Sequence, residues 1–280
     1  MLRLGLSILA SLVAAFGQTT DSPARVGFEV ASIRPNTGTA GEAYLQAIPG
    51  RLRMQNIALR PLIQLAYGVE AYQLSGGPSW IGSERFDIEA KAEGSPSIQQ
   101  MEGPMLQALL EDRFKLAVHR ETRQMPAWEI RVLNGKGRDG KGKLQPSTAE
   151  SCIPYRLDSP PPAAPERGQP RPNFCDYPHY GLQGQNRTLD GRGISMAALA
   201  QALSRADLHR PVIDKTDLTG MFDIHLEWTP DSMPAPGNPD PSDGPSLFTA
   251  LREQLGLKLD SSQALAEIIV IDRVEKPTGN

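Results

Sequence analysis

The chain has 280 residues, which is enough for one large domain or two domains of ordinary size. Hydrophobic residues make up 39% of the sequence and aromatic residues only 6%, so any core must be built mainly from aliphatic side chains. The formal net charge is −3 and no basic stripe runs along the chain, which argues against nucleic acid as a main partner.

The first 17 residues have the pattern of a secretory signal peptide. Arg3 supplies a short positive region, residues 4–16 are mostly apolar, and the small residues Ala15 and Gly17 suit a signal peptidase. The apolar run is too short to cross a bilayer comfortably as a permanent helix, and no later segment is long and apolar enough to do so. We therefore expect export to the periplasm or the outside of the cell, with an uncleaved anchor or a cytoplasmic N-terminal helix as the alternative interpretations.

The chain contains two cysteines, Cys152 and Cys175. In an oxidising compartment an even number of cysteines predicts a disulfide, here around a proline-rich loop. Closing a loop of this length would stabilise the fold by about 3 kcal/mol in the chain-entropy model. The alternative, a metal site completed by His179, is disfavoured because a structural zinc site needs four ligands at close spacing.

The sequence repeats itself. Residues 57–64 resemble residues 194–201, and the triplet Phe-Asp-Ile follows 29 residues after the first segment begins and 28 after the second. Such repeated spacing predicts one supersecondary unit used twice. We expect a first module at 26–135, a proline-rich connection with the disulfide at 136–190, and a second module at 191–276.

Apolar periodicity places the secondary structure of both modules. In the first module we expect strands at 28–33, 45–54 with a turn at Pro49-Gly50, 72–74, 85–92, 114–118 and 128–132, and helices at 59–67 and 98–110. In the second we expect strands at 188–194, 212–213, 222–228, 257–259 and 268–274, helices at 196–204 and 247–255, and a mobile loop at 230–245. Both modules read strand, helix, strand, strand, helix, strand, strand. This order predicts an α+β fold with helices packed on mixed or antiparallel sheets.

Three segments, at 80–91, 105–122 and 212–223, together resemble a soil-associated family of exported bacterial proteins of unknown function. Their motif residues are Trp80, Phe86, Asp87, Asp112, Arg113, Phe114, Asp214, Thr216, Gly220, Phe222 and Asp223. The resemblance implies no catalytic residue. Related domains are attached to membrane-bound sensor metalloproteases of the beta-lactam-response type, which implies a sensing or ligand-presenting role. The family pattern has Gly where this chain has Asp217, so the turn there is expected to differ or to be strained.

The sequence lacks the common catalytic motifs. It has no glycine-rich phosphate loop, no serine nucleophile elbow, no Ser-x-x-Lys pair and no histidine pair at the spacing of zinc peptidases. We therefore assign no catalytic residue, no cofactor and no metal ligand.

Several polar or aromatic groups leave two interpretations open. Asp112 and Arg113, with residues 119–121, either line a pocket for an anionic ligand or lie in solvent, which is usual for charged residues. The triplet 214–216 is either a polar site or, as we prefer, a turn capped by its own side chains. The three tryptophans are interpreted as core residues rather than a stacking surface for sugars or peptides. A calcium site made by the aspartates of the 230–245 loop does not match the known spacing.

We predict an exported, non-enzymatic binding protein whose partner is an envelope protein, a peptide or a polysaccharide. A hydrolase of envelope polymers is the alternative if Asp87, Asp112 or Glu121 converge in a cleft with strongly shifted pKa values. A sensor domain beside a membrane metalloprotease is the third. An exposed sheet edge or an apolar groove would favour peptide capture.

Overall fold

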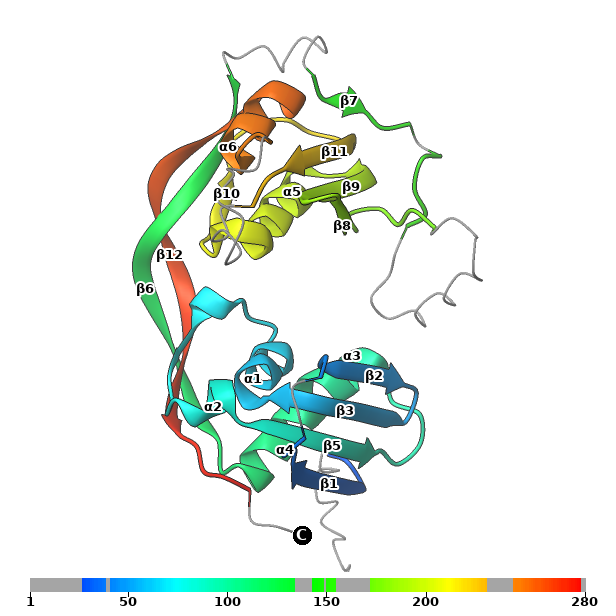
Figure 1. Ribbon diagram of the computed structural model, residues 1–280, viewed down its shortest axis with the longest axis vertical. Coiled ribbons are helices and arrows are strands. Elements are labelled where there is room, and N and C mark those ends of the chain that lie inside the picture. The colour runs from blue at the N-terminus through cyan, green and yellow to red at the C-terminus, as the bar shows by residue number, and fades with distance from the viewer. Residues whose placement is uncertain are drawn as a thin grey trace, which may run out of the picture.

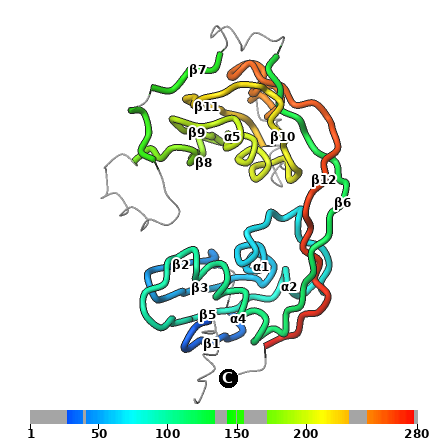
Figure 2. Tube along the Cα trace, turned by 180° about the vertical axis from the view of Figure 1, so that it is seen from behind, coloured from blue at the N-terminus to red at the C-terminus, as the bar shows by residue number. Residues whose placement is uncertain are grey.

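The computed structural model describes residues 27–38, 41–133, 143–148, 150–154, 172–230 and 244–277. Two lobes lie one above the other and are joined along one side by two long strands (Figure 1). The view from behind shows the same arrangement: among the described residues, these two strands carry the chain from one lobe to the other (Figure 2).

The first lobe contains an antiparallel sheet with helices packed against it. In spatial order its strands are β1 (Val30–Pro35), β5 (Arg85–Lys91), β3 (Arg51–Ala58) and β2 (Tyr44–Ile48). Its helical segments are α1 (Leu59–Tyr67), the 3-10 turn η1 (Ala71–Gln73), α2 (Trp80–Ser83), α3 (Ile98–Gln100), η2 (Met101–Met105) and α4 (Leu106–Arg113).

The second lobe has the same organisation. Its antiparallel sheet has the order β7 (Gln145–Pro146), β11 (Phe222–Trp228), β9 (Asn186–Ile194) and β8 (His179–Gln183). Its helical segments are α5 (Met196–Leu203), η4 (Ser204–Leu208), α6 (Leu247–Ala250) and η5 (Leu251–Leu255).

A third sheet connects the lobes. Its order is β10 (Val212–Asp214), β6 (Ala117–Val132), β12 (Leu257–Arg273) and β4 (Leu74–Gly76). The short strand after α1 pairs in parallel with β12, and the short strand after α5 pairs in parallel with β6. Each half of the chain thus provides a short strand that pairs with the long strand of the other half. The fold is α+β, as expected. The module boundaries at 135 and 191 stay a prediction.

The expectation of separate strands at 114–118 and 128–132, and at 257–259 and 268–274, was wrong. β6 and β12 are each continuous and pair antiparallel from Val132–Leu257 to Ala117–Arg273. Pro126 does not interrupt β6 because β10 pairs only with residues 128–130, so at Pro126 the strand has a single neighbour, on the β12 side. The mixed polar and apolar residues in between gave no periodic signal because much of this ribbon is exposed.

Three other features differ from the expectation. The helix expected at 98–110 is divided, because Gly103 has non-helical backbone angles (φ −97°, ψ −106°) and Pro104 follows it. The strand expected at 72–74 begins only at Leu74, after the 3-10 turn. Phe114 ends α4 rather than opening a strand.

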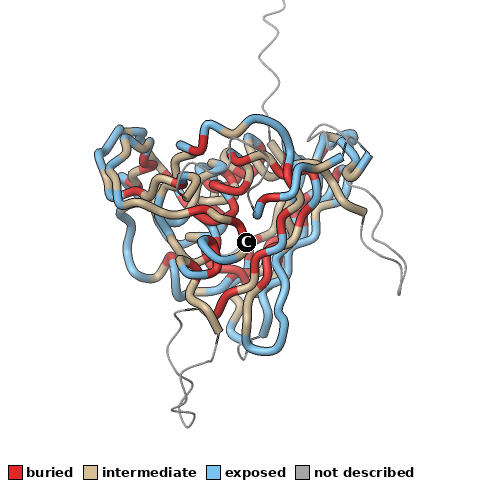
Figure 3. The backbone as a smooth tube through the Cα atoms, turned by 90° about the horizontal axis from the view of Figure 1, so that it is seen from above, coloured by how far each residue is buried: buried red, intermediate tan, exposed pale blue. Residues whose placement is uncertain are grey.

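Each lobe has its own aliphatic core, and each core is completed by the other half of the chain. Ile269 and Ile271 of β12 are buried in the first lobe, and Ile130 of β6 is buried in the second. Buried segments run through the interior of the described backbone and exposed segments surround them (Figure 3). No helix in the described ranges has the length and apolarity to cross a membrane.

Candidate functional site: a cleft between the lobes

A cleft of about 560 Å³ is lined by residues of both lobes. The first lobe contributes the end of α1 and the η1 turn, and the second contributes the exposed face of α5 and the segment before β10. The lining residues are Gly68, Glu70, Tyr72, Gln73, Asp176, Ser195, Ala197, Ala198, Gln201, Ser204, Pro211 and Val212. Hydroxyl, carboxylate and amide groups therefore face the same space from two directions.

The first wall of the cleft is fixed to the ribbon. Gly68 ends α1 in the left-handed conformation (φ 62°), which glycine adopts at low cost. Glu70 and Gln73 form a capping box around η1, with the Glu70 N–H donating to Gln73 Oε1 at 3.1 Å. Gln73 Nε2 donates to the Glu267 carbonyl of β12 at 3.0 Å. These bonds hold the η1 turn against the connecting strands.

The second wall is the amino end of α5. Ser195 caps this helix, since its hydroxyl accepts from the Ala198 N–H at 3.2 Å. The Ser195 N–H donates to Asp176 Oδ1 at 2.7 Å. The Asp176 N–H in turn donates to the Gly193 carbonyl at 3.0 Å. Asp176 is thereby held at the helix terminus, where its negative charge is favourable.

The disulfide positions this wall. Cys152 and Cys175 are bonded at an S–S distance of 2.07 Å, as the sequence predicts. A Cβ atom on Gly193 would lie 2.1 Å from Cys152 Sγ, so the disulfide packs directly on the backbone of β9. Because Asp176 follows Cys175, the covalent link fixes the carboxylate that faces α5.

Polar contacts connect the two walls. Arg205 Nε and Glu70 Oε1 form an ion pair at 2.5 Å. The Ser204 hydroxyl, which is buried, donates to the Arg210 carbonyl at 2.6 Å and lies 3.3 Å from the Tyr72 hydroxyl. These contacts close one end of the cleft and set the spacing of the lobes.

Tyr180 of β8 lies beside the same ion pair. Its hydroxyl donates to the Ala202 carbonyl of α5 at 2.8 Å. Burial raises the pKa of Tyr180, an effect that the positive charge of Arg205 opposes and the negative charge of Glu70 supports. The phenol is thus a neutral hydrogen-bonding group over the ordinary pH range.

The motif aspartates bind backbone, at equivalent places in the two lobes. Asp87 Oδ1 accepts from Asn36 Nδ2 at 2.8 Å and from the Asn56 N–H at 2.9 Å. Hydrogen bonds from Asn36 and Asn56, with the nearby charge of Arg53, lower the pKa of Asp87. Asn56 has φ 53° and lies at the register shift between β3 and β5.

In the second lobe Asp223 repeats this role. Asp223 Oδ1 accepts from Ser147 Oγ at 2.5 Å and from the Gly193 N–H at 3.3 Å. Gly193 has φ 66° and lies at the register shift between β9 and β11. The repeated Phe-Asp-Ile triplets therefore place one carboxylate on each bulge, where it holds a left-handed residue.

The motif aromatics pack in the cores. Phe86 is buried between Trp80 and Phe114, with ring centroids 6.4 Å and 5.3 Å away. Phe222 is buried in the second core, and so is Trp228, whose indole N–H donates to Asp207 at 2.5 Å. Trp128 packs against Phe248 and Arg210 outside both core clusters, and Trp80 is only partly buried, so of the three tryptophans expected in the core only Trp228 is fully buried.

The pocket expected around Asp112, Arg113 and residues 119–121 contains only the first two of these. These two form an ion pair at 3.1 Å and line a hollow of about 850 Å³ together with Glu29, Glu93 and Glu111. Residues 119–121 do not line this hollow; they lie on β6, where His119 contacts Asp272 and Arg120 contacts Glu267. Lys115 also lines the hollow, so four carboxylates and two basic side chains face it, and this mixed lining does not favour an anionic ligand.

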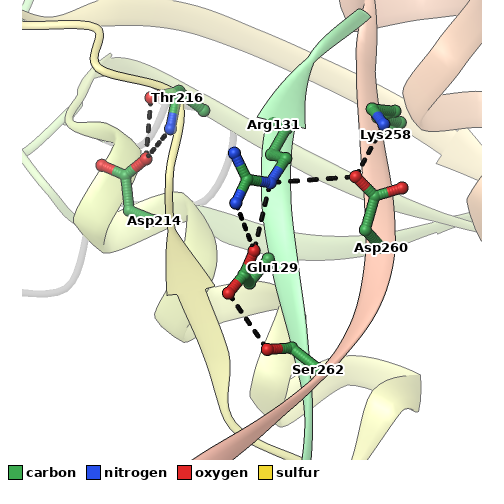
Figure 4. A network of polar contacts seen from close by, with 7 residues as sticks. All are labelled: Glu129, Arg131, Asp214, Thr216, Lys258, Asp260 and Ser262. Atoms are coloured by element: carbon green, nitrogen blue, oxygen red, sulfur yellow. Dashed lines mark hydrogen bonds and ion pairs between the residues drawn. The ribbon is translucent and has the colours of Figure 1, made fainter.

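The triplet 214–216 is a capped turn. Asp214 Oδ1 accepts from the Thr216 N–H at 2.9 Å and from its hydroxyl at 2.7 Å (Figure 4). Asp217 follows with φ 57°, so aspartate here keeps the left-handed conformation that glycine adopts readily. Gly220 also has a positive φ, 102°, with open space around it.

A second polar network lies beside this turn, on β6 and β12. Glu129 contacts Arg131 and Ser262, and Arg131 contacts Asp260, which also pairs with Lys258 (Figure 4). The hydrogen bond from Arg131, followed by that from Ser262, lowers the pKa of Glu129. Because Arg131–Asp260 and the hydrogen bond from Ser262 to Glu129 join the two strands, we interpret this network as support for the ribbon.

Asp87, Asp112 and Glu121, the carboxylates of the hydrolase alternative, contact different groups: the first bulge, Arg113 and Arg123 respectively. Among the described residues, no group of three or more His, Cys, Asp or Glu side chains is arranged to hold a metal ion. The aspartates considered for calcium, Asp231, Asp240 and Asp243, lie outside the described residues.

The cleft residues were not predicted as a site, although Ser195, Ala197, Ala198 and Gln201 belong to the repeated segment 194–201. Glu70, Tyr72 and Gln73 were assigned to a connection and a short strand, and Asp176 to the proline-rich connection. One available signal was the serine that precedes α5 at the position where α1 has Ala58, since serine is a preferred helix cap. The other was the position of Asp176 directly after a disulfide cysteine.

The comparisons with known proteins give a family but no activity. No curated protein matches the chain, and no solved structure does. A family model described as "Protein of unknown function (DUF3738)" matches residues 60–274, which is most of the chain but leaves out β1, β2 and β3 of the first lobe. The match runs from the start of α1 to the end of β12 and so includes both walls of the cleft. The chain belongs to the DUF3738 family.

Proposed function

We propose that this protein is an exported binding protein that holds its ligand in the cleft between the two lobes. The observation that carries the proposal is the cleft itself, where side chains from segments about 125 residues apart face one space: Tyr72 and Gln73 on one side, Ser195 and Gln201 on the other. Ligand sites occur preferentially in such concavities between structural units.

The chemistry of the lining favours binding over catalysis. Its polar side chains are hydroxyls, amides and two carboxylates, Glu70 and Asp176. Glu70 is paired with Arg205, and Asp176 accepts the N–H of Ser195. Groups held in this way suit a ligand with hydrogen-bond donors and little negative charge, such as a peptide or a sugar chain of the cell envelope.

Two features support export. Residues 1–17 have the charge and hydropathy pattern of a signal peptide. The disulfide between Cys152 and Cys175 is of the kind that persists in oxidising compartments.

A thermal-shift screen of the purified chain against peptides and envelope polysaccharide fragments tests the proposal. Gln201, exposed on α5 and lining the cleft, is replaced by tryptophan so that the indole fills the space. Gln99, exposed on α3 and outside the cleft lining, receives the same substitution as the matched control. A binding ligand should raise the melting temperature of the wild type and of Gln99→Trp, but not that of Gln201→Trp. Equal shifts in the two variants would place the ligand elsewhere.

A further inference from the structure

Among the described strands, two of those at sheet edges lack the usual protection against strand pairing. The edges formed by β4, β7 and β10 are two or three residues long, and β1 ends in Arg34-Pro35. Short length, charge and proline all discourage pairing with another chain. β2 and β8 have five residues each and contain no Lys, Arg, Asp, Glu or Pro.

Exposed apolar side chains gather on these same two strands. Of the ten large apolar side chains exposed among the described residues, three are on β2 and two on β8: Tyr44, Leu45, Ile48, Tyr180 and Leu182. Both strands are at the sheet edge that faces the gap between the lobes (Figures 1 and 2). A protein that only needed to stay soluble would gain by placing charge there.

β8 also borders a hollow of about 660 Å³. Its lining comprises Tyr180, Gly181, Leu182, Arg187, Thr188, Arg205 and Ala206. Two guanidinium groups line the hollow, and among the described residues no carboxylate does. Arg187 pairs with Asp207 and Arg205 with Glu70, yet both arginine side chains stay about half exposed, at 42% and 53%. Each guanidinium has five N–H donors, so these pairings leave donors for a further acceptor.

We propose that an extended peptide with apolar and acidic residues two positions apart, so that their side chains lie on the same face, binds by adding a strand to the free edge of β8. Its backbone would complete the open side of the sheet, an apolar side chain would contact Tyr180 and Leu182, and a carboxylate would lie between Arg187 and Arg205. The charge of the hollow selects an acidic peptide over a basic one. The hollow adjoins the cleft, since Arg205 pairs with Glu70 of the cleft wall, but the acidic peptide is a ligand distinct from that of the cleft and goes beyond the proposed function.

The test uses a fluorescein-labelled peptide, Thr-Val-Thr-Glu-Thr-Val. Fluorescence anisotropy measures the dissociation constant of its complex with the full exported chain. In an added strand only alternate N–H groups face the neighbouring strand. Two N-methylated peptides, one of each alternation, should therefore behave differently: one should lose affinity by roughly tenfold or more and the other should bind nearly as the parent does. A peptide with lysine in place of glutamate should also bind more weakly.

Two leucines provide matched protein variants. Leu182 on β8 is 78% exposed and Leu265 on β12 is 76% exposed, so aspartate at either position should leave folding intact. Leu182→Asp should weaken peptide binding by roughly tenfold, whereas Leu265→Asp should not change it. Circular dichroism of both variants confirms that they are folded.

Four results would overturn the assignment to β8: no binding by the wild type, equal effects of the two N-methylated peptides, equal affinities of the two leucine variants, or a peptide-free dimer that Leu182→Asp abolishes. The last would assign the edge to a second copy of this chain. None of them decides the proposed function, which depends on the separate response of Gln201→Trp to its own ligands.

Discussion

Replacing Asp87 by alanine tests whether the carboxylate of each Phe-Asp-Ile triplet holds a strand bulge. Asp87 accepts two hydrogen bonds, from the Asn36 side chain at 2.8 Å and the Asn56 N–H at 2.9 Å. A hydrogen bond to a charged acceptor contributes about 1.5–3 kcal/mol when buried, and we take a lower value of about 1–1.5 kcal/mol here because both contacts are only partly buried. Asp87→Ala should therefore reduce the free energy of unfolding by about 2–3 kcal/mol.

The equivalent change in the second lobe should be smaller. Asp223 accepts from Ser147 at 2.5 Å, but its bond from the Gly193 N–H is 3.3 Å long. Gly193 also adopts its left-handed conformation without help, whereas Asn56 does so at a cost. We expect Asp223→Ala to reduce the free energy of unfolding by about 1–2 kcal/mol.

Urea unfolding followed by far-ultraviolet circular dichroism measures both changes. Asp112→Ala is the control, because that side chain is 69% exposed and its contact is an ion pair with its neighbour Arg113. Exposed substitutions of this kind usually change stability by no more than about 0.5 kcal/mol. If Asp87→Ala lowers the free energy of unfolding no more than Asp112→Ala does, the carboxylate does not stabilise the bulge. The equivalent positions of the two triplets would then not contribute to stability.

The acid dependence of stability gives an independent measurement on Asp87. Its pKa is lowered in the folded protein, chiefly by the hydrogen bond from Asn36 and then by that from Asn56. A lowered pKa stabilises the fold above the unfolded-state pKa of about 3.9, and this stabilisation is lost as the pH falls through the folded-state pKa. Asp87→Asn should therefore flatten the loss of stability on acidification below about pH 4. If stability decreases below about pH 4 as steeply in Asp87→Asn as in the wild type, other carboxylates cause that decrease.

Further substitutions test the turns and the disulfide. Gly193→Ala should cost at least about 3 kcal/mol, because its Cβ would meet Cys152 Sγ at 2.1 Å, whereas Gly68→Ala, with a similar φ of 62° and open space, should cost about 1 kcal/mol; equal losses in thermal unfolding would contradict the packing of the disulfide on β9. Cys152→Ser should reduce the free energy of unfolding by about 3 kcal/mol. Because the disulfide positions Asp176, this substitution should also weaken the binding of any ligand whose binding Gln201→Trp abolishes. An unchanged affinity for such a ligand would show that the disulfide does not position the cleft wall. Asp217→Gly should be more stable than Asp217→Ala by about 1 kcal/mol, because φ is 57° there, and equal stabilities in urea would refute this.

Local patterns in the sequence predicted the local elements well. The alternation of β5 and β11 and the spacing of α1 and α5 are preserved in the structure because each of these segments buries one face in an aliphatic core. The disulfide was predictable from the cysteine count. The triplets Phe86-Asp87 and Phe222-Asp223 were recognised as equivalent, although their role on the bulges depends on left-handed residues that periodicity does not reveal.

Features that depend on distant partners were not predictable in the same way. β6 and β12 pair along their whole length, and in their middle they have an exposed surface and little apolar alternation. The parallel pairing of β4 with β12 and of β10 with β6 joins segments from opposite halves of the chain. The sequences of β4 and β10 do not indicate which strand each will pair with. Both strands are three residues long, so their bounds were predicted only approximately.

The exchange of these short strands bears directly on the cleft. Because β4 pairs at one end of the ribbon and β10 toward the other, each lobe is attached to both long strands rather than suspended from one. Gln73 and the Arg205–Glu70 ion pair add contacts near the same ribbon. The two walls of the cleft are therefore held at a set spacing before any ligand arrives. A ligand then has little protein motion to arrest, and the contacts it makes with Tyr72 on one wall and Gln201 on the other can contribute more fully to its affinity.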